Sequence, residues 1–158
     1  MVQRMNNAFS FAHGEGKAYW FNGTLMEMKA MGNETNGAFS LIEGTFPAGY
    51  QTPLHIKSNE EDIYYVLEGE IIFTLGETII TGKPGTFVYA PRGIQHKFEV
   101  VESSPAKMLV MYTPAGVEQF FMELGEPAKE LKLPPADHGI DMNEFIAVVK
   151  TYGVEILG

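Results

Sequence analysis

The chain has 158 residues, which predicts one domain large enough to bury a substantial hydrophobic core. It contains no cysteine, so disulfides and thiolate metal ligands are excluded. Its formal net charge of −9 argues against binding to nucleic acid or to anionic membranes, because both require clustered Lys and Arg. No apolar run approaches the length of a membrane span and no secretion signal is visible, so we expect a cytoplasmic protein.

The first two thirds of the chain predict a short arm followed by an all-β unit. Residues 1–18 are polar and contain glycine without a clear period, so we interpret them as an N-terminal arm. Beyond them, short strand-like runs alternate with turn signals, over residues 23–32, 37–49, 62–76, 77–85, 86–93, 95–101 and 106–113. Strands this short, with no long helix between them, are typical of a β-sandwich or barrel, and we assign residues 19–113 to that barrel.

Residues 114–158 predict two short helices that belong to the same domain and pack on the outside of the barrel. In the first helix, Thr113 is placed to cap the N-terminus, Pro114 to occupy the first turn and Gly125 to end the helix. In the second, Asp141 opens the capping box Asp-Met-Asn-Glu, which is followed by an apolar stripe.

Two segments of the predicted barrel carry histidines, glycines and an acid at regular spacings. Residues 49–69 follow the pattern Gly-x5-His-x-Lys-x4-Asp-x6-Gly, which resembles the first motif of the cupin superfamily, Gly-x5-His-x-His-x3–4-Glu-x6-Gly. Residues 85–96 follow Gly-x5-Pro-x-Gly-x2-His, which resembles the second motif. The chain is therefore similar to single-domain cupins of the quercetin 2,3-dioxygenase-like group. This resemblance implies an all-β fold, a jelly-roll barrel of two antiparallel sheets.

In this resemblance, the metal ligands of the family fall on His55, Lys57, Asp62 and His96. Lys57 stands where histidine is usual, and its ammonium group has no lone pair to offer a metal. The remaining two histidines and one carboxylate form the ligand set of non-haem iron(II) sites. The resemblance thus implies one divalent metal ion (Fe, Mn, Ni, Co or Zn) that is weakly bound or absent, because the ammonium repels it. Alternatively, Lys57 occupies the place of the metal and pairs with Asp62 or Glu61.

Further residues near the motifs are candidates for the wall of a pocket. Tyr64 and Val66 share the strand face of the motif acid, and Phe98 lies two residues after the second-motif histidine. We predict that all three line the pocket. Glu60 and Glu61 are interpreted as turn residues that face solvent.

The function implied by the resemblance is that of a small-molecule enzyme, a quercetinase-like dioxygenase that cleaves a flavonol or a related enolised aromatic. Asp62 would then be a metal ligand and also the catalytic acceptor of a substrate proton. Lys57 leaves two alternatives open: a non-oxidative isomerase or cyclase, and a non-catalytic small-ligand-binding protein with a degenerate metal site. We also expect a homodimer, since a small barrel leaves sheet edges and an outer face to cover.

Overall fold

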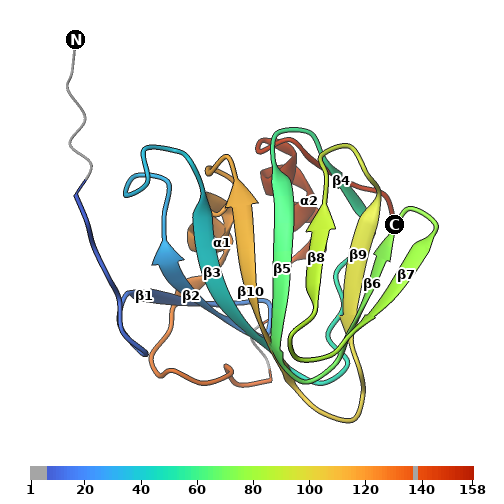
Figure 1. Ribbon diagram of the computed structural model, residues 1–158, viewed down its shortest axis with the longest axis horizontal. Helices are drawn as coiled ribbons and strands as arrows, with labels where there is room; N and C mark the ends of the chain where they lie inside the picture. Colours follow the sequence, from blue (N-terminus) through green and yellow to red (C-terminus); the bar gives the residue numbers. More distant parts are fainter. Residues whose placement is uncertain (1–6, 137–138) are drawn as a thin grey trace.

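The computed structural model describes residues 7–136 and 139–158, and its strands form two antiparallel sheets (Figure 1). The first six residues of the predicted arm lie outside this described part. The larger sheet has the strand order β11 (Glu126–Pro127), β1 (Lys17–Phe21), β2 (Thr24–Ala30), β3 (Ser40–Phe46), β10 (Ala106–Thr113), β5 (Glu61–Glu68) and β8 (Phe87–Ala90). The smaller sheet has the order β12 (Val154–Ile156), β4 (His55–Lys57), β9 (His96–Val100), β6 (Ile71–Leu75) and β7 (Thr78–Gly82). The predicted jelly-roll barrel of two antiparallel sheets is confirmed.

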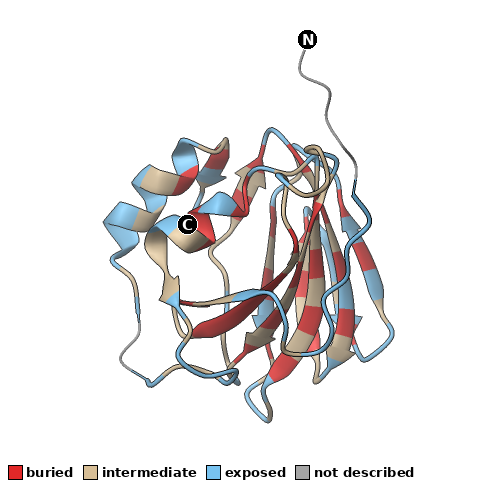
Figure 2. Ribbon diagram, turned by 90° about the vertical axis from the view of Figure 1, so that its left-hand side faces the viewer, coloured by how far each residue is buried: buried red, intermediate tan, exposed pale blue. Residues whose placement is uncertain are grey.

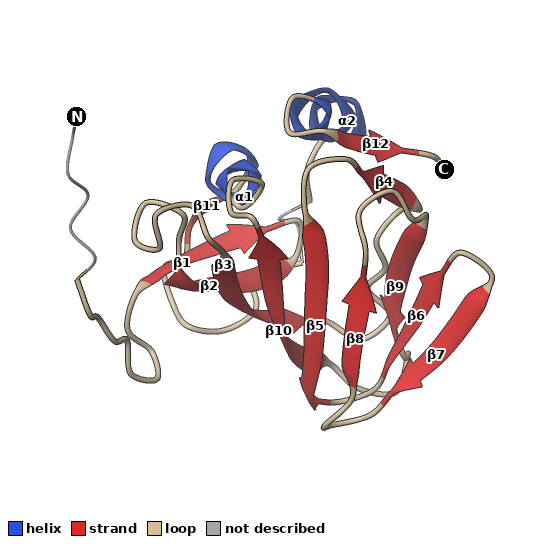
Figure 3. Ribbon diagram, turned by 45° about the horizontal axis from the view of Figure 1, so that its top comes forward, coloured by secondary structure: helices blue, strands red, loops and turns tan. Residues whose placement is uncertain are grey.

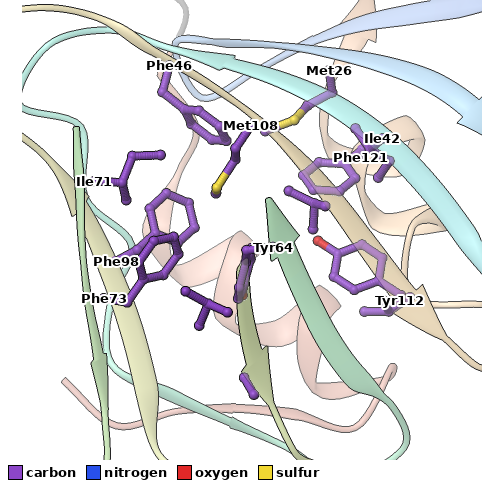
Figure 4. Packing of buried hydrophobic residues seen from close by; sticks show 14 of the residues in the cluster. Met26, Ile42, Phe46, Tyr64, Ile71, Phe73, Phe98, Met108, Tyr112 and Phe121 are labelled. Carbon is purple, nitrogen blue, oxygen red and sulfur yellow. The ribbon is translucent and has the colours of Figure 1, made fainter. Parts of the chain in front are cut away.

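The alternation of side chains explains why these segments form strands. β3 and β10 bury every second residue, and Figure 2 shows buried positions interrupted by more exposed ones along the strands. The inward residues meet between the two sheets and form the core (Figure 4). Its largest fully buried apolar side chains are Phe46, Phe73, Met28, Ile42, Ile71 and Met108. Each such burial stabilises the fold by about 1.5–3 kcal/mol before entropy is subtracted.

Two helices close the side of the barrel between the edges of the two sheets (Figure 3). α1 (Gln119–Leu124) contacts β1 and β11 at one edge of the larger sheet, and α2 (Met142–Lys150) contacts β12 at one edge of the smaller sheet. Both helices turn apolar residues toward the barrel, because Phe120, Phe121 and Val149 are buried. None of the described helices is long and apolar enough to cross a membrane.

The second predicted helix begins where the capping box places it, whereas the first does not. The Asp141 carboxylate accepts a hydrogen bond of 2.9 Å from the backbone N–H of Glu144. Thr113 is instead the last residue of β10 and pairs with Glu61 across the sheet, so α1 begins only at Gln119. The prediction that Thr113 caps α1 is wrong because the sheet ladder holds this residue in an extended conformation.

Candidate metal centre

The two cupin-like segments deliver their polar side chains to one place inside the barrel. β4 lies between β12 and β9, and both His55 and Lys57 point inward from it because they are two residues apart. His55 is paired with His96 of β9, and the two ring centroids are 4.2 Å apart. Asp62 approaches from β5 of the larger sheet and is only 1 % exposed. The cluster therefore combines residues from both sheets.

The Asp62 carboxylate accepts hydrogen bonds from several directions. The ammonium of Lys57 lies 3.1 Å from Oδ1 and 2.9 Å from Oδ2. The hydroxyl of Tyr64 donates to Oδ2 at 3.0 Å, and Nε2 of His96 lies 3.2 Å from the same oxygen. Burial alone would raise the pKa of Asp62, but the Lys57 ammonium and the contact with His96 lower it below its usual value. The carboxylate is therefore ionised and held in a fixed orientation.

Each histidine is oriented by the backbone carbonyl two residues before it. Nδ1 of His55 lies 2.8 Å from the oxygen of Pro53, and Nδ1 of His96 lies 3.2 Å from the oxygen of Ile94. A proton on Nδ1 satisfies each carbonyl and directs Nε2 toward the cluster, which is how metal-binding histidines are held in other proteins. Burial, together with the charges of His96 and Lys57, lowers the pKa of His55 to about 3. His55 is therefore neutral and presents a lone pair.

The Lys57 side chain is buried inside the cluster and is only 6 % exposed. Its ammonium lies 4.1 Å from the centroid of the Tyr112 ring, a cation–π contact, in addition to its bonds with Asp62. Of the two predicted acidic partners, only Asp62 binds this ammonium. Glu61 points to the other face of the strand and binds the guanidinium of Arg92, with Nη2 2.9 Å from Oε1.

The donor set fits a divalent cation. His55, Asp62 and His96 each offer one ligand atom, and these atoms lie within 4.8 Å of one another. Nε2 of His96 and Oδ2 of Asp62 lie 3.2 Å apart, and a hydrogen bond between them forms when Nε2 carries the proton. Occupation by a metal nevertheless requires Lys57 to leave Asp62, since the ammonium covers both carboxylate oxygens.

A second acid lies beside the cluster. Glu60 is 3 % exposed, and its Oε2 has no hydrogen-bond partner among the described residues. Burial raises the pKa of Glu60; the charge of Lys57 opposes this shift and that of Asp62 adds to it. The interpretation of Glu60 as a solvent-facing turn residue is wrong, because it shares the inward phase of Asp62 just before β5 begins.

An apolar cavity lies next to the cluster, so a small molecule in the cavity could reach the polar side chains. His55, Lys57 and Asp62 contribute polar atoms to its wall, and Tyr64 and Phe98 line it as well. Val66 is fully buried in the core and is not among the lining residues. The remaining wall is mostly apolar, although Asn22, Gln51 and Thr52 also line it. Its apolar residues come largely from the strands and the C-terminal helices, among them Phe21, Met26, Ile42, Phe46, Val110, Tyr112, Phe120, Phe121, Phe145 and Val149.

Two groups of aromatic rings form much of this wall. Phe21 of β1 packs edge-on against Phe121 of α1, with 5.1 Å between ring centroids. Beside the polar cluster, Phe98 packs against Tyr64 at 5.9 Å and against Phe46 at 5.3 Å (Figure 4). Sequence reasoning missed the helical part of the wall and also Tyr112. The buried phase of β10 was the available signal for Tyr112, whereas the helical residues carry no local signal of cavity contact.

A barrel of two antiparallel sheets with two histidines and a carboxylate inside it is the arrangement expected from the two cupin-like motifs. The model of the family described as Cupin domain matches residues 42–112 of the chain. The chain therefore contains a cupin domain over residues 42–112, in agreement with the resemblance of its two motifs. This match covers the strands from β3 to β10 and leaves the arm, β1, β2 and the C-terminal helices outside.

Two curated relatives are similar to the chain. The chain is 22% identical over 144 residues to quercetin 2,3-dioxygenase of Bacillus subtilis (strain 168), covering 91% of this chain and 42% of that enzyme. It is 37% identical over 75 residues to the uncharacterized protein MJ1618 of Methanocaldococcus jannaschii, covering 48% of this chain and 60% of that protein. The chain thus spans less than two thirds of the length of either relative.

Solved structures support the fold. KdgF from Halomonas sp. superposes with a TM-score of 0.61 at 16% identity, covering 72% of this chain and 98% of that one. An RmlC-like cupin from Shewanella frigidimarina superposes with a TM-score of 0.60 at 19% identity, covering 73% of this chain and 99% of that one. At these identities the likeness concerns the barrel alone.

Proposed function

We propose that the protein is a small-molecule enzyme of quercetinase-like type, a metal-dependent dioxygenase that acts on a flavonol or a related enolised aromatic. The observation that carries this proposal is that His55 and Asp62 line a cavity with aromatic walls, while His96 lies against both of them. A planar apolar molecule fits such walls, and its polar oxygen would reach the cluster. The similarity to a quercetin 2,3-dioxygenase over most of the chain supports the same reaction class.

His55, Asp62 and His96 would hold one divalent ion, for which Fe, Mn, Ni, Co and Zn are the candidates. Such an ion would supply Lewis acidity toward an enolic oxygen and, where it is redox-active, reactivity toward dioxygen. The side chains themselves position the substrate. The lone pair on Nε2 of neutral His55 can accept a hydrogen bond from a substrate hydroxyl, and the apolar wall excludes water.

Asp62 is the proposed acceptor of the substrate proton. Its lowered pKa makes it a weak base while Lys57 and Tyr64 donate to it. Its basicity would rise once the ammonium of Lys57 moves away, because loss of an adjacent positive charge raises the pKa of a carboxyl group. Proton transfer to Asp62 is therefore coupled to the position of Lys57 in this proposal.

A second candidate function is favoured by one observation, the ion pair between Lys57 and Asp62. If the ammonium permanently replaces a metal, the cavity serves a non-oxidative isomerase or cyclase, or a non-catalytic protein that binds a small ligand. The two histidines and the ammonium would then orient an oxygen of the ligand without a metal ion.

Oxygen uptake separates the two candidates. Protein purified without chelators is assayed for metal and then for uptake with quercetin after loading with Fe, Mn, Ni or Co, against a blank for spontaneous oxidation of quercetin. We expect uptake with at least one of these metals, and we expect it to be lost in Asp62→Asn and retained in the matched exposed control Glu61→Gln. Quercetin binding without uptake for any metal would instead support the binding protein.

We further propose that the protein is a homodimer that associates through the outer face of β5 and β8. Tyr65, Phe87 and Tyr89 on this face are 42%, 60% and 51% exposed, and Tyr65 lies opposite Phe87 in the ladder. Clustered exposed aromatics of this kind mark interaction surfaces. Glu61 at this face is paired with Arg92, so its charge adds little to the repulsion between two chains of net charge −9.

Light scattering tests the dimer. The native protein should have the mass of two chains, and Phe87→Lys should shift it to one. The matched control is Ile79→Lys, since Ile79 is 69% exposed on β7 of the other sheet and should leave the mass unchanged. A monomeric native protein at micromolar concentration would contradict the proposal.

A further inference from the structure

We propose that Glu60 is a second binding partner for the Lys57 ammonium, and that transfer of the ammonium from Asp62 to Glu60 frees the Asp62 carboxylate for a divalent cation. The first half of this inference concerns only side chains that are present in the chain. The second half rests on the proposed metal-dependent function. The exchange explains how a lysine can occupy a ligand position without abolishing the metal site.

The unsatisfied carboxylate of Glu60 is the first observation behind the inference. Glu60 is 3% exposed, and its Oε2 has no hydrogen-bond partner within the described part of the chain. Buried polar atoms in folded proteins are nearly always paired, because an unpaired one loses its bonds to water without replacement. A buried carboxylate with a free oxygen is therefore prepared to accept a donor that another state of the site supplies.

The relative placement of the two acids is the second observation. Residues 60, 61 and 62 alternate between inward and outward positions, so Glu60 and Asp62 both face inward while Glu61 faces Arg92. Lys57 is the strongest of the charges that act on the Glu60 carboxyl group. The lysine side chain has four rotatable carbons and three equivalent donors, so it can turn from one carboxylate toward another.

Charge balance gives the exchange its driving force. With the ammonium on Asp62, an incoming dication is repelled by this adjacent positive charge, and both oxygens of the carboxylate already contact the ammonium. With the ammonium on Glu60, the dication binds Asp62 without competition. The Lys57 ammonium is then paired with the Glu60 carboxylate. Glu60 therefore acts as a positioning residue that works through Lys57 and does not ligate the metal.

Unfolding of the metal-free protein in the presence of a chelator tests the first half. Glu60→Gln is measured in the native background and in Asp62→Asn, where the ammonium has lost its first partner. We expect Glu60→Gln to lower the unfolding midpoint by at least twice as much in the Asp62→Asn background as in the native one, because Lys57 then depends on Glu60. Equal shifts in the two backgrounds would overturn the proposal.

Calorimetric titration with Ni²⁺ tests the second half and does not require Asp62→Asn to fold. The four proteins are native, Glu60→Gln, Lys57→Met and the double variant Lys57→Met/Glu60→Gln. We expect Glu60→Gln to weaken Ni²⁺ binding about tenfold when Lys57 is present and less than twofold when it is replaced by Met. An equal loss in both backgrounds would mean that Glu60 acts directly on the ion, and it would overturn the exchange.

The two measurements distinguish failure of this inference from failure of the proposed function. Suppose that no variant binds Ni²⁺ while unfolding in the presence of the chelator gives the unequal midpoint shifts. Glu60 is then confirmed as the second partner of Lys57, and the metal-dependent function is contradicted. If Ni²⁺ binds, but Glu60→Gln changes neither the Ni²⁺ affinity nor the unfolding midpoint in any background, the metal site is supported. The proposed role of Glu60 is then contradicted.

Discussion

Glu61 and Asp62 are adjacent on β5, carry the same charge and have opposite environments. Glu61 points outward and pairs with Arg92, and these two side chains are 20% and 49% exposed. Asp62 points inward and pairs with Lys57, and these two are 1% and 7% exposed. The period of two in a strand is the only reason for the difference. Water screens the outer pair, whereas the inner pair has only protein groups to satisfy its charges.

The comparison shows that an ion pair has consequences in proportion to its burial. The outer pair can be broken at little cost because water replaces either partner. The inner pair cannot lose one partner without leaving a desolvated charge, so any ligand that binds Asp62 must also provide for Lys57.

The largest expected effect comes from removing every carboxylate that can receive the Lys57 ammonium. The double variant Asp62→Asn/Glu60→Gln should lose about 3–5 kcal/mol of unfolding free energy, because it leaves a buried cation without an anion. Adding Lys57→Met should restore most of this loss, since no buried charge then lacks a partner. Urea unfolding with a chelator measures both. A loss smaller than about 1 kcal/mol would show that the inner pair behaves like a surface pair.

The next effect is on stability as a function of pH, and it comes from His55. Its pKa is about 3 in the folded protein and about 6.5 in an unfolded chain. Between these two pKa values His55 is protonated in the unfolded chain and neutral in the folded protein. The free energy of unfolding therefore falls as the pH is lowered. We expect a loss of roughly 1.5 kcal/mol between about pH 6.5 and pH 5.

The variant His55→Asn isolates this contribution. Urea unfolding of the metal-free protein across this pH range should give a flatter curve for His55→Asn than for the native protein. Parallel curves would mean that His55 is protonated as easily in the folded protein as in water. His13→Asn is the matched substitution control, because His13 lies in an exposed turn far from the cluster in sequence.

A smaller effect concerns metal affinity at position 57. Lys57→Met removes the repulsion between ammonium and dication, and we expect Ni²⁺ or Zn²⁺ to bind about tenfold more tightly. Lys57→His also adds a fourth ligand, so about a further tenfold gain is expected, and the affinity of the native protein should rise with pH. Calorimetric titration measures the order His, Met, Lys. If Lys57→His binds no more tightly than the native protein, position 57 does not serve the metal site.

The smallest effect is expected for the outer pair. Glu61→Gln removes the partner of Arg92 at a position that water can reach. The urea midpoint should stay close to that of the native protein, and any difference should shrink further when salt is raised to about 0.5 M. A shift as large as that of Asp62→Asn would contradict the contrast between the two faces of β5.

Much of the barrel could be predicted from the sequence, because its signals are local. Alternating apolar residues and glycine turns mark the strands, and the capping box at Asp141 marks α2. The two motifs also pointed to His55, Asp62 and His96, which the structure brings together. Their role as metal ligands stays a prediction, as does the assignment of the segment boundaries at residues 18 and 113.

The unpredicted features depend on contacts between residues far apart in the chain. The ring of Tyr112 reaches Lys57 only because β10 lies next to β5. The start of α1 was misplaced since Thr113 is held by the sheet, a contact that helix-capping rules do not include. Glu60 could not be distinguished from Glu61 in sequence, because the register of β5 decides which of two neighbouring acids turns inward.

The pairing of β12 with β4 connects the end of the described chain to the site. Val154 lies opposite Lys57 and Ile156 opposite His55, while β4 meets β9 through the pair of His55 with His96. A three-residue strand with so little other support takes its position from the strand that follows α2. A change that displaces β12 would thus also displace the strand that carries His55. A proteolytic cut between α2 and β12 should therefore loosen the cluster without touching any of its residues.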